Sequence, residues 1–124
     1  MKNIALIPAR GGSKGIKRKN IKLFNKKPLI YWSIKQALES YSIDRVIVST
    51  DDDEIADIAR AFSAEVPFIR PSLLAQDDTP GIDPVLHAIE NLLNVENILL
   101  LQPTSPLRRP FDIDEIFKIR SKYN

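Results

Sequence analysis

The sequence contains no cysteine and only one histidine among its 124 residues. The absence of cysteine excludes disulfide bonds and thiolate-bound metal sites. Long apolar runs are also missing: none approaches the ~18 residues of a membrane-spanning helix, and the run near the N-terminus is interrupted by Pro8. We therefore expect a globular chain that has no membrane partner and is located in the cytoplasm.

Acidic residues are absent from the first part of the chain. Residues 1–38 contain ten Lys or Arg and no Asp or Glu, whereas residues 39–124 contain eight basic and sixteen acidic residues. The net charge of +2 therefore hides a strongly polarised chain. This asymmetry indicates an anionic partner for the N-terminal part, either a nucleic acid or a nucleoside triphosphate. A solvated basic face is the alternative, and we favour it less because glycines are interleaved with the cations.

Short apolar runs alternate with segments of helical periodicity. The apolar runs predict strands at residues 4–8, 45–50, 66–69 and 98–101. The first helix is predicted to place Ile30, Ile34, Ala37 and Leu38 on one face. Strands that are apolar throughout and alternate with helices form parallel sheets with helices on both faces. We therefore predict a single nucleotide-binding α/β domain over residues 1–124, with a Rossmann-like, mostly parallel sheet.

A glycine-rich, cationic loop follows the first predicted strand. Ligands of such sheets bind at the carboxyl ends of the strands. Glycines allow main-chain N–H groups to approach phosphate oxygens closely, and the side chains of Arg10, Lys14 and Lys19 add positive charge. The loop is therefore predicted to bind a polyphosphate.

Two common phosphate-binding motifs are absent from this loop. The Walker motif requires Gly-Lys followed by Ser or Thr, but Gly15 is followed by Ile16 and Lys17. The Gly-x-Gly-x-x-Gly fingerprint of dinucleotide-binding proteins is also missing. P-loop NTPases and Rossmann dehydrogenases are therefore disfavoured.

Six blocks, in order along the chain, carry a specific resemblance. They are IPARGGSKG at 7–15, RKNIK at 18–22, KPLI at 27–30, VSTDD at 48–52, VPFIRP at 66–71 and LQPTSPLR at 101–108. In these blocks the sequence resembles the N-terminal half of the CMP-sialic acid synthetases, the acylneuraminate cytidylyltransferases. The resemblance implies a nucleotidyltransferase fold, which is similar to the glycosyltransferase-A (GT-A) fold.

The resemblance implies an enzyme that transfers CMP from CTP to a nine-carbon acidic sugar and releases pyrophosphate. N-acetylneuraminic, legionaminic and pseudaminic acids are the expected acceptors, and Mg²⁺ is the expected cofactor. Two alternatives remain open: a sugar nucleotidyltransferase with another acceptor, and a non-catalytic CTP-binding module. A nucleic-acid-binding protein is disfavoured, because no set of stacking aromatic residues is interleaved with the cations.

The resemblance also assigns roles to individual residues. Arg10, Lys14 and Lys19 are expected to be catalytic, because they would hold the triphosphate and stabilise the departing pyrophosphate. Gln102 is expected to face both nucleotide and sugar, and Arg108 to help bind the sugar. The full expected nucleotide-binding set is Ala9, Arg10, Gly11, Gly12, Ser13, Lys14, Lys19, Asn20, Arg70, Gly81 and Gln102. Relatives often have serine where this chain has Gly81, so one hydroxyl contact is expected to be lost or replaced.

Members of this family are longer than this chain and are homodimeric. The resemblance places their metal-binding Asp-x-Asp pair, much of the sugar pocket and the dimerisation segment beyond residue 124. We therefore expect the Mg²⁺ ligands to lie outside this chain, and we expect these residues to bind CTP with little or no turnover.

Several other residues invite a functional interpretation. Asp51, Asp52 and Asp53 could hold Mg²⁺, but we prefer a helix start, because Asp51 and Glu54 have the spacing of a capping box. The single histidine, His87, has no catalytic partner at a recognisable spacing. The remaining residues of this kind are expected to be structural: Tyr31 and Trp32 packing on the sheet, and Lys26 and Lys27 in a solvated turn.

Overall fold

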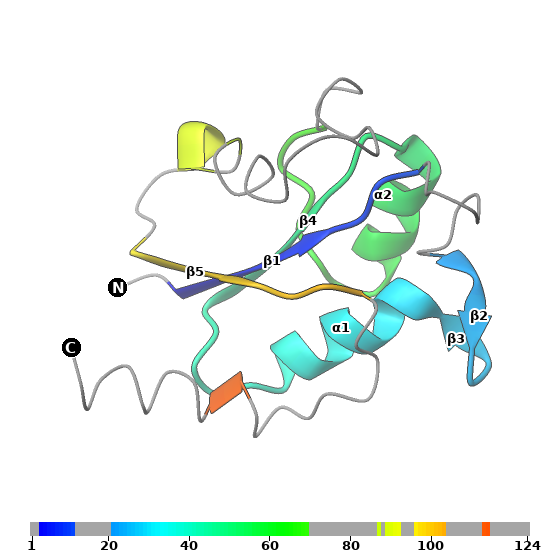
Figure 1. The fold of residues 1–124 in the computed structure, drawn as a ribbon, viewed down its shortest axis with the longest axis horizontal. Helices are drawn as coiled ribbons and strands as arrows, with labels where there is room; N and C mark the ends of the chain where they lie inside the picture. The colour runs from blue at the N-terminus through cyan, green and yellow to red at the C-terminus, as the bar shows by residue number, and fades with distance from the viewer. Residues whose placement is uncertain are drawn as a thin grey trace.

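A three-stranded parallel sheet forms the centre of the computed structural model, which describes residues 3–11, 21–69, 87, 89–92, 96–103 and 113–114. The strands are β1 (Asn3–Pro8), β4 (Arg45–Ser49) and β5 (Asn97–Leu100), in the order β4-β1-β5. Strand β1 is central and pairs with both neighbours (Figure 1). These strands confirm three of the four predicted ones, with ends that differ by one residue.

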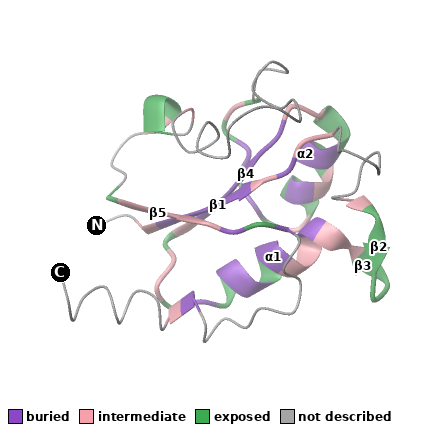
Figure 2. Ribbon diagram, viewed as in Figure 1, coloured by how far each residue is buried: buried purple, intermediate pink, exposed green. Residues whose placement is uncertain are grey.

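Residues 4–7 of strand β1 are buried on both faces, which explains why this part of the sequence is apolar throughout. Successive side chains of a strand point to opposite faces. Ala5 and Ile7 accordingly belong to one hydrophobic cluster, and Ile4 and Leu6 belong to a second. All four side chains are inaccessible to solvent, as the buried colour of this strand shows (Figure 2).

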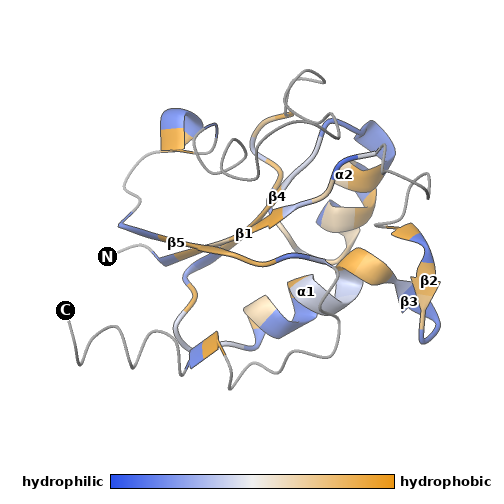
Figure 3. Ribbon diagram, viewed as in Figure 1, coloured by the Kyte–Doolittle hydropathy of each residue, from blue (hydrophilic) through white to orange (hydrophobic). Residues whose placement is uncertain are grey.

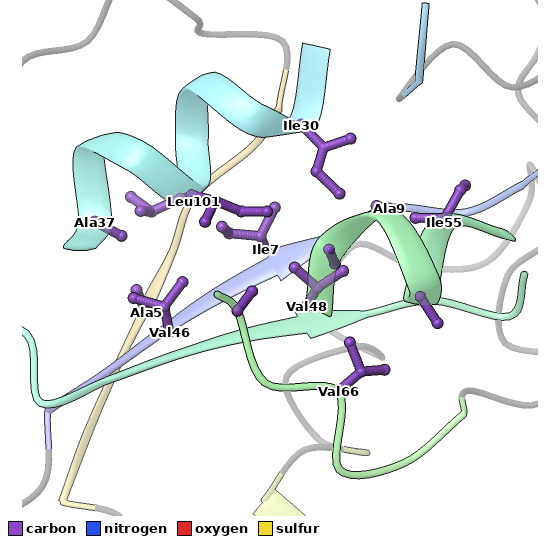
Figure 4. Packing of buried hydrophobic residues seen from close by; sticks show 14 of the residues in the cluster. Ala5, Ile7, Ala9, Ile30, Ala37, Val46, Val48, Ile55, Val66 and Leu101 are labelled. Atoms are coloured by element: carbon purple, nitrogen blue, oxygen red, sulfur yellow. The ribbon is translucent and has the colours of Figure 1, made fainter. Parts of the chain in front are cut away.

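Helices α1 (Leu29–Leu38) and α2 (Asp53–Ala61) cover the same face of the sheet. Ile30 of α1 and Ile55 of α2 pack in one cluster with Ile7 of β1 (Figure 4). On the opposite face, Phe68 and Leu92 pack on the second cluster, and the backbone at residues 89–91 is helical. The predicted arrangement, a parallel sheet with helical segments on both faces, is confirmed.

Three side chains of α1 differ from the predicted packing. Leu38 is 49% exposed, because it lies about 80° around the helix from Ile30, at the edge of the buried stripe. The aromatic residues do not pack on the sheet. Trp32 contacts Phe24 with ring centroids 6.4 Å apart, and Tyr31 contacts Phe62 at 4.9 Å.

A β-hairpin that the sequence did not predict precedes α1. Its strands are β2 (Leu23–Phe24) and β3 (Lys27–Pro28). Asn25 and Lys26 connect them with φ values of 50° and 71°, as in a type I′ turn. The hairpin is tied to α1 by two hydrogen bonds, from Trp32 Nε1 to the Phe24 carbonyl and from the Leu29 N–H to the Lys22 carbonyl, each 2.8 Å long. Strand β2 is apolar and the turn that follows it is hydrophilic (Figure 3). The predicted solvated turn is confirmed, since Lys26 and Lys27 are exposed.

The strand predicted at residues 66–69 is wrong. Only Glu65 pairs with the sheet, through hydrogen bonds to Val46 and Val48 of 2.8 and 2.9 Å. Pro67 has no N–H to donate to a ladder, and the Val66 carbonyl instead accepts a hydrogen bond from Arg60. The Glu65 side chain accepts two hydrogen bonds from Arg45, and these lower the pKa of the carboxyl group.

Asp114 ties residues 113–114 to the end of α1. Its Oδ1 accepts hydrogen bonds from the Ser40 hydroxyl at 2.6 Å and from the Ser42 N–H at 3.0 Å. The adjacent Ile113 is completely buried in the first cluster. Burial raises the pKa of Asp114, but the hydrogen bonds from Ser40 and Ser42 outweigh it, so the pKa is lowered.

We expect this tie to make stability depend on pH. Because the pKa of Asp114 is lower in the folded state than its ordinary value of about 3.9, the carboxylate stabilises the fold above that value. The contribution is lost as the pH falls through the folded-state pKa. Asp114→Asn should lower the free energy of unfolding at neutral pH by about 0.5–1.5 kcal/mol and weaken its acid dependence, measured by urea unfolding between about pH 7 and pH 3. The control is Asp57→Asn, at an exposed carboxylate; acid curves that are parallel for Asp114→Asn and the wild type would contradict the assignment.

Candidate nucleotide-binding site

The carboxyl ends of β1, β4 and β5 lie at one edge of the sheet, because all three strands are parallel (Figure 1). The segments that leave this edge begin with residues 9–11, 50–52 and 101–103. The prediction that they converge is confirmed for these residues. Of the expected site residues, Ala9, Arg10, Gly11 and Gln102 are described. Those that lie outside the described residues are Gly12, Ser13, Lys14, Lys19, Asn20, Arg70, Gly81 and Arg108.

The start of the glycine-rich loop is fixed by main-chain hydrogen bonds. The Ala9 N–H donates to the Ser49 carbonyl at 2.8 Å, which continues the pairing of β1 with β4 by one residue. On the other side of β1, the Leu101 N–H donates to the Leu6 carbonyl at 2.9 Å. Ala9 itself is completely buried. The chain therefore enters the loop from a fixed position at the centre of the sheet.

Gly11 marks the point at which the loop leaves the sheet. Hydrogen bonds in a parallel ladder are evenly spaced, so the donor after Ala9 would be Gly11, with the main-chain carbonyl of Asp51 as its acceptor. The Gly11 N–H instead donates to the side-chain Oδ1 of Asp51, at 2.9 Å. The carboxylate thus replaces the next main-chain acceptor, and the sheet pairing ends there.

Asp52 caps helix α2. Its Oδ1 accepts a hydrogen bond from the Ile55 N–H at 3.1 Å, and its own N–H donates to the Thr50 hydroxyl at 3.1 Å. The predicted use of this acidic cluster for helix capping is confirmed, but the prediction that Asp51 is the capping residue is wrong by one position. Asp51 instead accepts the hydrogen bond from the Gly11 N–H. Sequence reasoning missed this role, since its only signal was an Asp at the end of a predicted strand.

Gly11 has no room for a side chain. A Cβ atom at this position would lie 2.6 Å from Asp52 Oδ2 and 2.9 Å from Asp52 Cβ. Asp52 cannot turn away without losing its hydrogen bond to Ile55. Glycine is therefore required here by the close approach of the loop to the start of α2.

Arg10 and Gln102 follow the neighbouring strands β1 and β5. Arg10 is half-buried between Ala9 and Gly11, while Gln102 is exposed and is flanked by the buried Leu101 and Pro103. Their positions place a cation and an amide at the same edge of the sheet, as a site for an anionic nucleotide requires.

Within the described part of the chain, no group of three or more His, Asp or Glu residues could hold a metal ion. Asp51 and Asp52 are already engaged with Gly11 and Ile55. Their main role in the structure is thus to hold the start of the loop and of α2, and Mg²⁺ ligands outside this chain remain a prediction. His87 packs its ring against Phe68, with centroids 4.9 Å apart. No helix among the described residues is long and apolar enough to cross a membrane.

Residues 4–122 match a family model described as cytidylyltransferase. The chain belongs to this family. It is 40% identical to the N-acylneuraminate cytidylyltransferase of Escherichia coli over 95% of its own length and 28% of the enzyme's. It is also 40% identical to the CMP-N,N'-diacetyllegionaminic acid synthase of Legionella pneumophila, over 98% of this chain and 56% of that protein. The pseudaminic acid cytidylyltransferase of Campylobacter jejuni is 44% identical, over 86% and 48%. The chain thus spans about half, or less, of the relatives it matches.

Solved structures show the same fold. The chain resembles CMP:2-keto-3-deoxy-manno-octonic acid synthetase complexed with CTP with a TM-score of 0.86, at 24% identity, over 98% of this chain and 48% of that one. A cytidylyltransferase from Leptospira borgpetersenii gives a TM-score of 0.77, also at 24% identity, over 96% and 48%. The predicted Rossmann-like nucleotidyltransferase fold is confirmed.

The close approach of Gly11 to Asp52 can be tested by a double-mutant cycle. Gly11→Ala should lower the free energy of unfolding by about 1–3 kcal/mol, because the new methyl group would overlap the Asp52 side chain. Asp52→Ala alone should cost about 1 kcal/mol through the lost cap. It also removes Oδ2 and Cγ, so Gly11→Ala should cost less in that background, with a coupling above about 0.5 kcal/mol in urea unfolding. If the two substitutions changed the free energy of unfolding additively, the Gly11 and Asp52 sites would not be in steric contact.

Proposed function

We propose that the chain forms the CTP-binding part of a cytidylyltransferase that acts on a nine-carbon acidic sugar. The reaction transfers CMP from CTP to N-acetylneuraminic, legionaminic or pseudaminic acid and releases pyrophosphate. The observation that carries the proposal is the glycine-rich cationic loop, whose first residues are fixed at the carboxyl edge of a parallel sheet. The 40% identity to an N-acylneuraminate cytidylyltransferase supports this choice of nucleotide and sugar.

In this proposal the loop binds the triphosphate. Main-chain N–H groups and the cations of Arg10, Lys14 and Lys19 neutralise its charge. The anomeric hydroxyl of the sugar attacks the α-phosphorus, forms a new P–O bond and releases its proton to the solvent. The bond from the α-phosphorus to the oxygen that bridges it to the β-phosphorus breaks, and pyrophosphate leaves with that oxygen. The negative charge of the leaving group grows during this step, so cations held beside it lower the barrier.

Other residues would orient the two substrates. Arg70 offers a planar set of donors for the cytidine portion, and Asn20 would hold the nucleotide. Gln102 would lie between nucleotide and sugar, and Arg108 would help bind the sugar carboxylate. Gly81 offers no hydroxyl. Mg²⁺ would neutralise phosphate charge; the described residues contain no group of three or more candidate ligands, and we assign the ion no step. The cytoplasmic location stays a prediction.

Calorimetric titration with CTP and ATP, with and without Mg²⁺, tests the nucleotide assignment. Lys19→Ala should weaken CTP binding by about tenfold or more, because a charge-assisted contact to phosphate is lost. Lys26→Ala is the matched control, since Lys26 is an exposed lysine at the turn of the β2–β3 hairpin. It should leave the affinity within about twofold. Equal losses in the two variants would remove the loop assignment.

The sugar assignment is tested by pyrophosphate release from CTP in the presence of each of the three acids. Release with one acid identifies the acceptor. CTP binding without release from any of them supports the non-catalytic alternative or another acceptor. Titration with single-stranded DNA tests the nucleic-acid-binding alternative. Tight binding of DNA without any preference for CTP would overturn the proposal. Such DNA binding would weaken steeply as the salt concentration rises.

A further inference from the structure

We propose that Asp51 is a positioning residue that holds the start of the glycine-rich loop in the conformation that accepts CTP. It acts through the N–H group of Gly11 and does not itself contact the nucleotide. This inference rests on the proposed function and adds to it a residue that lies 40 positions away from the loop in the sequence.

The hydrogen bond from the Gly11 N–H to Asp51 lies where the glycine-rich loop leaves the sheet. It follows the main-chain pairing of β1 with β4, which ends at Ala9 and Ser49. Residues 12–20, which include Lys14 and Lys19, follow immediately in the sequence. The bond is partly buried and its acceptor is a carboxylate, and charge-assisted hydrogen bonds of this kind are stronger than neutral ones. It therefore sets the direction in which the loop leaves the sheet.

The residues on both sides of Asp51 are held in place by burial or by hydrogen bonds. Ser49 and Thr50, which precede it, are completely buried. Asp52, which follows it, is fixed by its hydrogen bonds to Thr50 and to the N–H of Ile55 in α2. The Asp51 carboxylate holds Gly11 from one side, while the Asp52 side chain fills the space beside the Gly11 Cα. The hydrogen bond to Asp51 and the contact with Asp52 thus fix the position of Gly11 beside the start of α2.

The charge of Asp51 argues that it acts as an acceptor and not as a ligand of the nucleotide. A carboxylate near a triphosphate repels it, so its charge by itself would weaken CTP binding. Its oxygen, in contrast, supplies the acceptor that the Gly11 N–H needs. The two effects are separable, because asparagine keeps the oxygen and removes the charge.

The size of the effect follows from the fraction of molecules whose loop is ready to bind. Apparent affinity falls in proportion to that fraction. If the loop is correctly placed in about one molecule in ten once the hydrogen bond is lost, CTP binding weakens about tenfold. Contacts between bound CTP and the rest of the site are not altered by this change.

The experiment compares CTP binding by the 124-residue chain in four forms, by calorimetry. Asp51→Ala should weaken binding about tenfold, and Asp51→Asn should stay within about threefold of the wild type. Asp53→Ala is the control: it removes the same charge from an exposed neighbour in the first turn of α2 and should stay within about twofold. Wild-type affinity in Asp51→Ala, equal losses in Asp51→Ala and Asp51→Asn, or an equal loss in Asp53→Ala would each overturn the inference.

A second measurement does not depend on the alanine variant being folded. Hydrogen exchange of the Gly11 amide, followed by NMR in the absence of CTP, should be slow in the wild type and in Asp51→Asn. Exchange at the rate of an unstructured peptide in the wild type would overturn the inference. Failure of the proposed function is distinguishable: a wild type that binds no CTP removes both, whereas a wild type that binds CTP as tightly as Asp51→Ala removes only the role of Asp51.

Discussion

The structure depends on the burial of strand β1 between two hydrophobic clusters while both of its edges are hydrogen-bonded to parallel neighbours. A fully buried Ile or Leu side chain contributes on the order of 1.5–3 kcal/mol relative to exposure, and Ile4, Leu6 and Ile7 are all inaccessible. A strand held in this way has one position and one register. Because the glycine-rich loop begins where this strand ends, the position of the first loop residues is fixed by the strand.

The end of the strand matters as much as its interior. Pro8 lacks an N–H, and Ala9 makes the last main-chain hydrogen bond to β4. The N–H of Gly11 then donates a hydrogen bond to a side-chain carboxylate. Three successive changes within four residues thus turn a regular ladder into a loop. The carboxylate that receives the Gly11 N–H belongs to the turn after β4, so the strand that pairs with β1 also fixes the loop that leaves it.

Much of this fold could be predicted from the sequence, because strands buried on both faces must be apolar throughout, as residues 4–7 are. The hairpin could not be predicted: its turn is Asn25-Lys26, whereas the usual signal for two positive φ values is Asn-Gly. The capping residue was misplaced for a similar reason. Consecutive carboxylates at 51–54 offer two nearly equal capping registers, and the contact that chooses between them comes from Gly11, which local spacing does not report.

The two ends of the cationic segment between β1 and the hairpin are both fixed by hydrogen bonds. Lys and Arg are frequent in residues 10–22, and fixing any segment of chain in one conformation costs conformational entropy. At one end the Gly11 N–H is held by Asp51, and at the other the Lys22 carbonyl accepts from the N–H of Leu29 at the start of α1. Closing a chain between two fixed points costs less when the free segment is short. The hairpin therefore does more than connect β1 to α1: by fixing Lys22, it leaves residues 12–21 as the only stretch between the two hydrogen-bonded points, whereas the whole connection from β1 to α1 spans about twenty residues.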